Sequence, residues 1–323
     1  MAVYTHLGAE QLAGLIAEFD VGALRSAKGI AEGVQNSNWL IETTGRDGAG
    51  ARFILTMYEE RTEVRELPFF LGLMDHLSAR GCPVPATIHD RAGQAFRRLD
   101  GKPVALIEFL SGVSVSEPTP GQARAVGAAL ARVHLASLDF PMRRANNLGP
   151  EGWRQLIDGC GPGGLDAIDP TLGGLVETEL TKLIAQWPTD LPSSVIHADL
   201  FPDNVLMIDD TVCGLIDFYF ACTDITAYDL AVTHASWCFD ATGTRFAPDL
   251  STALLDGYQS IRPLSSAERA ALPLLARGAT MRFLASRAYD WLHTPADAFV
   301  TRKDPLAFAR RLTFYRDHPG VFA

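Results

Sequence analysis

A carboxylate and two further oxygen donors stand at a spacing that suits phosphoryl transfer. The carboxylate is Asp199 in His-Ala-Asp-Leu-Phe-Pro-Asp-Asn (197–204), which ends at Asn204, and Asp217 follows in Ile-Asp-Phe. Asp199 could act as a base toward a hydroxyl group. Asn204 and Asp217 could hold Mg²⁺, which prefers oxygen ligands and keeps several of its waters. A base, a metal ion and positioned phosphates are the parts that transfer from ATP requires.

A hairpin is expected to bring the two metal-binding candidates together. The segments 205–208 and 212–216 are apolar and rich in β-branched residues, and Asp209-Asp210-Thr211 between them has the composition of a turn. Such a hairpin would place Asn204 roughly opposite Asp217. Directly paired residues have Cβ atoms about 5 Å apart, so both side chains could reach one cation.

Other residues of this region have ordinary structural explanations. Asp209 and Asp210 are expected to serve only as turn residues. His197 is expected to hydrogen-bond the loop rather than to carry a proton. The segment as a whole still favours a functional interpretation, because an apolar strand (194–196) precedes it and the hairpin that follows leads to Asp217.

The composition is that of an acidic globular protein. Its 323 residues exceed the usual size of one domain, which predicts two lobes. A hydrophobic fraction of 47% and a charged fraction of 20% are ordinary for a globular enzyme. A net charge of −10 and the lack of any Lys/Arg run argue against a nucleic-acid-binding surface. Substrate phosphates would therefore need local capture by metal and backbone groups.

The start of the chain and its cysteines indicate a cytoplasmic protein. Met-Ala-Val-Tyr-Thr-His lacks the regions of a signal peptide, and no apolar run reaches the roughly 18 residues of a membrane span. We therefore expect no membrane partner. The sequence has 5 cysteines without C-x-x-C spacing, which predicts reduced thiols rather than disulfides or a zinc site.

Hydrophobic periodicity predicts an α+β protein with two lobes. The first lobe (1–110) is expected to open with a helix and to contain antiparallel sheet, with a second helix starting near Pro68. Its strand-like segments are 39–43, 52–58, 95–99 and 103–109.

The second lobe (111–323) is predicted to be mostly helical. Thr119-Pro120-Gly121-Gln122 is typical of a helix start, with Thr119 as N-cap and Gln122 completing a capping box. Glycines at 159–164 and 173–174 are predicted to mark loops. Further helices are expected near 175–187, 227–239, 250–258, 269–291 and 305–315.

These residues resemble the aminoglycoside phosphotransferase and choline kinase branch of the protein-kinase-like fold. The pattern H-x-D-x-x-x-x-N at 197–204 is typical of that superfamily. Leu-Thr-Met-Tyr-Glu (55–59) and Asp-Phe-Tyr-Phe (217–220) are similar to segments of its homoserine kinases, and the likeness extends over nearly the whole chain. The resemblance implies a bilobal fold, with a small antiparallel-sheet lobe that binds the nucleotide and a larger helical lobe for catalysis and substrate binding.

The resemblance also implies roles for residues, with ATP as donor, Mg²⁺ as cofactor and L-homoserine as acceptor. Asp199 would orient and deprotonate the attacking hydroxyl, while Asn204 and Asp217 would hold Mg²⁺. The turn at 33–39 would cover the phosphates with backbone N–H groups, although it lacks G-x-G-x-x-G and could be an ordinary hairpin turn. The segment 107–112 would be the hinge that binds adenine, or simply the end of a strand. Nucleotide-binding residues implied in this way are Gly33, Asn36, Ser37, Asn38, Thr56, Glu108 and Leu110.

The phosphate-binding lysine usual in this fold has no clear counterpart. Thr56 occupies the aligned position on the third strand. Lys28, expected just before the first strand, and Arg52, which shares strand parity with Thr56, are alternatives, and solvated surface is the other explanation for Lys28. Homoserine kinases are similar to this chain in having Thr there, so Thr56 is not interpreted as loss of activity. The usual acidic partner, Glu63 or Glu66, then has no assigned role.

The acceptor site is predicted from charge. Homoserine is a zwitterion, so its carboxylate needs a cation or N–H groups and its ammonium needs an acidic or carbonyl group; an arginine can pair with a carboxylate in bidentate fashion. Arg282, on a helix face that could look into the cleft, is the candidate for the carboxylate, with a salt bridge as the alternative. Asp203 is the candidate for the ammonium. Residues expected in the core or in loop caps rather than at the site are His234, Trp237 and Asn147.

Two other functions fit the sequence. A kinase for another small alcohol, such as choline, an aminoglycoside or a sugar, would use the same catalytic residues. A nucleotide-binding pseudokinase would explain Thr56, but the intact Asp199, Asn204 and Asp217 oppose it.

Overall fold

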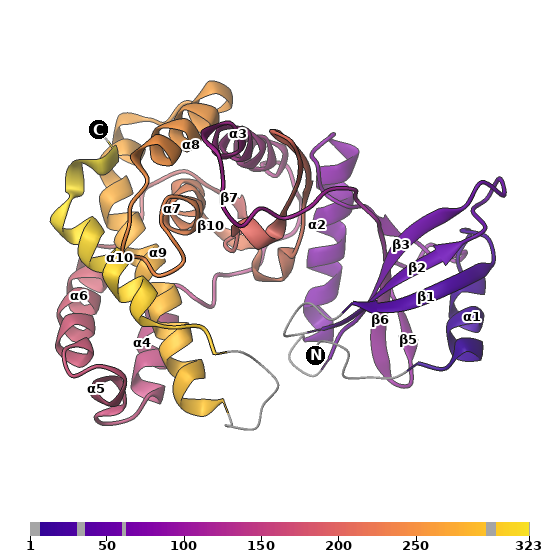
Figure 1. Cartoon of the computed structure of the whole chain (residues 1–323), viewed down its shortest axis with the longest axis horizontal. Helices are drawn as coiled ribbons and strands as arrows, with labels where there is room; N and C mark the ends of the chain where they lie inside the picture. Colours follow the sequence, from indigo (N-terminus) through magenta and orange to yellow (C-terminus); the bar gives the residue numbers. More distant parts are fainter. Residues whose placement is uncertain (1–6, 31–35, 60–62, 295–301, 323) are drawn as a thin grey trace. The chain divides into compact units, whose positions relative to one another are not determined.

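The computed structural model describes residues 7–30, 36–59, 63–294 and 302–322. Within them, helices combine with antiparallel strand pairs, which confirms the α+β class. The chain forms two compact units, Met1–Ser111 and Gly112–Ala323, coloured from indigo to yellow along the sequence in Figure 1. No helix of the described part is long and apolar enough to span a bilayer.

The first unit is built around an antiparallel sheet. Its strands are β1 (Leu24–Ile30), β2 (Ser37–Thr43), β3 (Ala51–Met57), β4 (Thr87–Ile88), β5 (Arg97–Leu99) and β6 (Lys102–Glu108). They follow the order β1-β2-β3-β6-β4, and β5 also pairs with β6. Alternate residues of β2 are buried, so one face of this strand enters the core.

Helix α1 (Ala9–Ala17) packs its apolar side against that sheet. Its buried residues and the inward residues of the strands form one hydrophobic cluster that contains Leu12, Ile16, Trp39, Ile41, Leu55, Val104 and Leu106. Helix α2 (Leu67–Ala79) carries Pro68 in its first turn, as predicted. Proline is tolerated there because its missing N–H would have no partner within the helix.

Strand β1 was missed by the sequence analysis, and the expectation that Lys28 precedes the first strand is wrong. Lys28 lies within β1, is exposed, and is paired with Leu40 of β2. The central residues of β1 are all exposed because the strand lies at the edge of the sheet. An edge strand with little burial has no alternating apolar pattern, and charged residues are common on such edges.

The second unit is mainly helical. Its helices are α3 (Pro120–Ala136), α4 (Pro150–Gly159), α5 (Gly164–Ile168), α6 (Leu172–Gln186), α7 (Thr226–Trp237), α8 (Pro248–Ile261), α9 (Ser266–His293) and α10 (Leu306–Asp317). Two small antiparallel pairs complete it, formed by β7 (Ser193–Ile196) with β10 (Cys222–Ile225) and by β8 (Val205–Ile208) with β9 (Thr211–Leu215). Every residue of α7 is buried, and the helix contacts α3, α8 and α9 around it (Figure 1).

The predicted start of α3 is confirmed. The Gln122 N–H donates to Thr119 Oγ1 at 3.2 Å, and the Thr119 N–H donates to Gln122 Oε1 at 3.0 Å. This capping box satisfies two N–H groups that have no partner within the helix. In contrast, the prediction that 173–174 marks a loop is wrong, because both glycines lie inside α6.

Helices α3 and α8 cross so closely that each needs a glycine at the contact. A Cβ atom on Gly127 would lie 2.1 Å from the carbonyl oxygen of Leu254, and one on Gly257 would lie 2.0 Å from that of Arg124. Both contacts are with backbone, which cannot rotate away. The two glycines therefore set the distance between these helices.

We expect Gly127→Ala to lower the free energy of unfolding by about 1–3 kcal/mol, because the added methyl group must push α3 and α8 apart. Urea denaturation followed by circular dichroism measures this change. Gly174→Ala in α6 is the matched control, since a Cβ atom on Gly174 would have no other atom within 4 Å. Equal effects of the two substitutions would contradict the close-crossing explanation.

Candidate active site

The candidate catalytic residues lie on two loops of the second unit. The segment from β7 to β8 contains Asp199 and Asn204, and the segment from β9 to β10 contains Asp217. Because β8 pairs with β9 and β10 pairs with β7, both segments begin and end at paired strands. This pairing brings the two halves of the motif together.

The predicted hairpin exists, but its register differs by one residue. The Ile216 N–H donates to the Asn204 carbonyl at 3.0 Å, so Asn204 lies opposite Ile216 rather than Asp217. The turn is formed by Asp209 and Asp210 rather than centred on Asp210 and Thr211, which by itself would pair Asn204 with Leu215. A bulge between Leu206 and Met207 then shifts the pairing back by one residue, to Ile216. A bulge adds one residue to one strand, which periodicity does not reveal.

The side chain of Asn204 faces Asp199. Its Nδ2 donates to the Asp199 carbonyl at 2.8 Å and lies 3.4 Å from Asp199 Oδ2. These contacts occupy the amide nitrogen and leave the amide oxygen for another partner. The orientation suits a cation ligand.

His197 holds the loop, as predicted. It is 1% exposed, its Nε2 donates to the Ile216 carbonyl at 2.9 Å, and its Nδ1 accepts the Asp199 N–H at 3.2 Å. Burial lowers the pKa of His197, so the ring is neutral and can make both contacts at once.

Asp229 of α7 binds the backbone of the candidate catalytic loop (197–204), called the catalytic loop below. Its carboxylate accepts the N–H groups of His197 at 2.7 Å and Ala198 at 2.8 Å, and His134 Nε2 lies 3.0 Å away. Burial alone would raise the pKa of Asp229, but the hydrogen bonds and the nearby histidines outweigh it and hold the pKa below its ordinary value. The sequence analysis missed Asp229, although a lone aspartate in an otherwise largely apolar buried helix was a usable signal.

Arg282 holds the same loop from its other side. Ala198 has a left-handed backbone with φ 63°, which is costly for a residue with a Cβ. Its N–H is bound by Asp229, and its carbonyl accepts from Arg282 Nη1. Arg282 Nη2 also lies 3.7 Å from Asp199 Oδ1. Both ends of the strained residue before Asp199 are therefore fixed by charged groups.

The guanidinium of Arg282 has little free surface. The residue is 2% exposed, and its Cζ lies 4.3 Å from the ring centroid of Phe283 and 5.2 Å from that of Phe220. Its role as a ligand of the acceptor carboxylate stays a prediction. These contacts favour a different role for Arg282, in which it positions Asp199.

The carboxylates of Asp199 and Asp217 are poorly hydrated, which raises their pKa values. Burial raises the pKa of Asp199, while Arg282 opposes the rise. The pKa of Asp217 is raised to about 7, first because the surrounding protein limits hydration of its carboxylate and then because Asp199 and Asp203 are nearby. Asp217 itself remains reachable from solvent. A cation arriving there would relieve the repulsion.

The other predicted residues of this unit lie where core or surface roles suffice. Trp237 is buried and its Nε1 donates to the Leu200 carbonyl at 3.0 Å, which adds a further hold on the loop. His234 is buried, whereas Asp203 and Asn147 are exposed.

The described residues predicted to bind the nucleotide lie on or next to β2, β3 and β6 of the first unit. Thr56 is buried and its Oγ1 donates to Asn38 Oδ1 at 2.8 Å across the β2–β3 pair. Asn36 and Ser37 are also buried, and Ser37 Oγ donates to Glu59 Oε1 at 2.8 Å. Gly33 lies outside the described residues.

The strand register shows on which face of the sheet Lys28, Arg52 and Lys102 lie. Lys28 is paired with Leu40 and Arg52 with Glu42, which places both on the sheet face that carries Thr56. Lys102 pairs with Glu59 at 2.5 Å and shares strand parity with the core residues of β6, so it lies on the opposite face. Arg52 also stacks on Phe109, with its Cζ 4.3 Å from the ring centroid.

At the predicted hinge, Glu108 is bound to Ala86. The Glu108 N–H donates to the Ala86 carbonyl at 2.9 Å, and the Ala86 N–H donates to Glu108 Oε2 at 3.2 Å. Leu110 is partly exposed beyond the end of β6. Glu63 pairs with Arg65 ahead of α2, and Glu66 is the residue before that helix.

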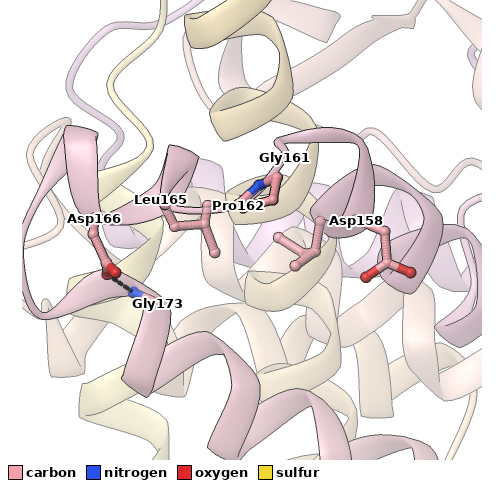
Figure 2. A pocket seen from close by; sticks show the side chains of 8 residues that line it. Asp158, Gly161, Pro162, Leu165, Asp166 and Gly173 are labelled. Atoms are coloured by element: carbon pink, nitrogen blue, oxygen red, sulfur yellow. Dashed lines mark hydrogen bonds between the residues drawn. The ribbon is translucent and has the colours of Figure 1, made fainter.

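A separate pocket of about 340 Å³ lies among α4, α5 and α6. Figure 2 shows Asp166 of α5 bound to the backbone of Gly173, with Oδ1 accepting the N–H at 3.1 Å. The lining residues include Asp158, Gly161, Pro162 and Leu165, and none of the catalytic candidates is among them.

Comparison with known proteins decides the family. A model of the phosphotransferase enzyme family matches residues 26–264. The homoserine kinase of Methylobacterium radiotolerans is 52% identical over 316 residues, which cover 98% of this chain and 96% of that protein. The chain belongs to this phosphotransferase family, in its homoserine kinase group. The homoserine kinase of Gluconobacter oxydans is 50% identical and covers 99% of this chain and 100% of its own length. The protein is therefore an enzyme.

Solved structures of other kinases confirm the predicted protein-kinase-like fold. Amicoumacin kinase, in complex with AMP-PNP, Ca²⁺ and Ami, matches with a TM-score of 0.71 over 98% of this chain and 95% of that chain, at 14% identity. A microcompartment-associated aminopropanol kinase matches with a TM-score of 0.64 over 98% of each chain, at 18% identity. At such identities the likeness concerns the fold alone.

We expect Asp229→Asn to lower the free energy of unfolding by about 2–4 kcal/mol and to reduce kcat. An amide cannot accept both loop N–H groups, so one buried donor is left without a partner. Chemical denaturation and steady-state kinetics measure the two effects. Asp256→Asn, which removes one partner of an exposed ion pair with Arg124, should change either quantity little.

Stability should fall as the pH drops below about 6.5. Burial lowers the pKa of His234 to about 3, and its ring nitrogens lie 2.5 Å from Tyr315 Oη and 2.7 Å from Ser251 Oγ. Below pH 6.5 the unfolded chain binds a proton that the folded protein excludes, so this residue costs about 2 kcal/mol of stability by pH 5.

His234→Asn should therefore flatten the pH dependence of unfolding, whatever it does to stability at neutral pH. Urea denaturation of both proteins at pH 7 and pH 5 gives the comparison. Identical losses in the two proteins would show that His234 does not titrate on unfolding.

Proposed function

We propose that this enzyme transfers the γ-phosphoryl group of ATP to the hydroxyl of L-homoserine in the cytoplasm. The product is O-phosphohomoserine, an intermediate of threonine biosynthesis. The names and full-length similarity of relatives about 50% identical support the choice of acceptor. The observation that carries the reaction type is the geometry of the loop, in which Asp199 and Asn204 are in contact and both are fixed through backbone.

Asp199 is the proposed base. Its backbone N–H is bound by His197, and the preceding residue is held by Asp229 and Arg282, so its carboxylate has a defined position. Burial raises the pKa of Asp199 toward the range in which a carboxylate accepts a proton readily. Phosphoryl transfer depends mainly on positioning and electrostatics, which makes this rigidity the main contribution of the loop.

Asn204 and Asp217 are the proposed Mg²⁺ ligands. Both supply oxygen, and the contacts of the Asn204 amide nitrogen leave its Oδ1 available. The raised pKa of Asp217 and its exposure to solvent fit a group that becomes fully ionised when a cation approaches. Mg²⁺ held there would offset the charge of the β- and γ-phosphates.

The first unit is the proposed nucleotide-binding lobe. Backbone groups around Gly33, Asn36, Ser37 and Asn38 would cover the phosphates. Thr56 stands where a lysine is usual and is bound to Asn38, so it would support that turn rather than supply charge. Glu108 and Leu110 would contact adenine through the main chain.

We expect Asp199→Asn to reduce kcat by about 10²–10⁴, the usual contribution of a positioned base, while the affinity for ATP changes little. A coupled assay of homoserine-dependent ADP release measures turnover, and calorimetry with ATP and Mg²⁺ measures binding. Asp256→Asn, which also replaces an aspartate by asparagine but lies on the surface, is the control for general effects of such a substitution on folding and activity. Unchanged turnover of Asp199→Asn would rule out the assigned role.

The same assay identifies the acceptor when applied to L-homoserine, L-serine, choline, a sugar and an aminoglycoside. A higher kcat/KM for any alcohol other than homoserine would contradict the proposed substrate. Binding of ATP without turnover on the whole panel would favour a pseudokinase.

A further inference from the structure

Two arginines of the second unit stack on one aromatic ring. The Cζ atoms of Arg287 on α9 and Arg311 on α10 lie 4.5 Å and 4.4 Å from the ring centroid of Phe308. Arg311 is 4% exposed, whereas Arg287 is partly exposed and can be reached from solvent. The two positive charges are thus held close together, and only that of Arg287 is open to solvent.

These two guanidinium groups lack a carboxylate partner within the described residues. Arg287 Nη1 donates to the carbonyl of Asp304 at 3.2 Å, and Arg311 Nη2 donates to that of Asp240 at 2.8 Å. Within the same residues, Arg311 Nε is buried and has no hydrogen-bond partner. Burial, followed by the charge of Arg311, lowers the pKa of Arg287 to about 10. A pair of cations in this state binds an anion favourably.

The pair lies beside the catalytic loop. The ring of Phe308 is 5.0 Å from that of Phe283 and 6.2 Å from that of Phe201, measured between centroids, and Phe201 follows Asp199 by two positions in the loop. Lys303 adds a third cation, with its Nζ 5.9 Å from the Phe201 centroid. The charge of Asp199 acts on both Arg287 and Lys303.

Arg282 is a weaker candidate for anion binding than this pair. Its guanidinium already contacts the Ala198 carbonyl and lies 3.7 Å from Asp199 Oδ1. Arg287 has no such carboxylate within the described residues, and it is more open to solvent. Arg287 is therefore the more accessible of these two guanidinium groups to an incoming anion.

We propose that Arg287, backed by Arg311 and joined by Lys303, binds the α-carboxylate of an amino-acid acceptor whose hydroxyl meets Asp199. This inference rests on the proposed function and names the group that would make the enzyme select an amino acid over a simple amino alcohol. A planar guanidinium can bind a carboxylate in bidentate fashion, which fixes the direction of the rest of the molecule. The phosphate group of the product is also an anion that these cations could bind, and the experiment distinguishes it from the carboxylate.

The test compares L-homoserine with 2-amino-1,4-butanediol, in which a hydroxymethyl group replaces the carboxylate. For Arg287→Ala we expect KM for homoserine to rise by about 10- to 100-fold, the usual effect of losing a charged hydrogen bond, with KM for ATP changed by less than about twofold. The preference of the wild type for homoserine over the diol should disappear in the variant. Arg316→Gln on the same helix as Arg311 removes an exposed ion pair with Asp317 and should leave both values unchanged.

Four results would overturn the inference. A wild-type enzyme that uses the diol as well as homoserine has no carboxylate site. An Arg287→Ala enzyme that loses affinity for ATP, or for O-phosphohomoserine in product inhibition, but not for homoserine has lost a phosphate site. Equal losses for homoserine and the diol, together with a lowered melting temperature, indicate a structural role. If the wild type uses neither compound but phosphorylates another alcohol, the proposed function itself fails and the carboxylate site with it.

Discussion

The buried carboxylate of Asp229 is the interaction on which the catalytic loop depends. It accepts two consecutive backbone N–H groups, from His197 and Ala198, and is supported by His134 on α3. Such a charge would be very costly inside a protein without these donors. The same donors give it a lowered pKa, so the carboxylate stays ionised across the neutral range. The loop is therefore tied to the central helix of the unit.

Strain in the loop follows from this arrangement. Ala198 adopts a left-handed conformation that its Cβ disfavours, and the structure holds it there with an anion on its N–H and a cation on its carbonyl. The backbone of Asp199 is therefore fixed through the residue before it, and the longer contacts of its carboxylate with Asn204 and Arg282 add to this. A carboxylate that is not fully neutralised can still accept a proton, and its charge adds to the effect of burial in raising the pKa of Asp217. The site thus combines a rigid carboxylate, the proposed base, with a place that favours a cation.

Charges that are only partly neutralised gather in two separate places of the second unit. Asp199, Asp203 and Asp217 gather negative charge at one end of the site, and Arg287 and Arg311 gather positive charge around Phe308. Both groups lack full neutralisation within the described part of the chain. A zwitterionic acceptor together with a metal–nucleotide complex carries the complementary charges. This gives a physical reason why the net charge of −10 is compatible with binding phosphates.

Much of this protein could be predicted from neighbouring residues in the sequence. The motif 197–204 with Asp217 determined the class of reaction, and Thr119, Pro120 and Gln122 determined where α3 begins, because capping and motif spacing are local properties. Strand β1 was not visible, since an edge strand buries too little to show a pattern. The hairpin register was missed by one residue because the turn lies one residue earlier than predicted, and a bulge, which leaves no periodic trace, offsets only part of that shift. The contacts of Asp229, Arg282, Arg287 and Arg311 are visible only in the tertiary structure. These residues are remote from the motif in sequence, and whether a charge is bound, buried or without a partner depends on what packs against it.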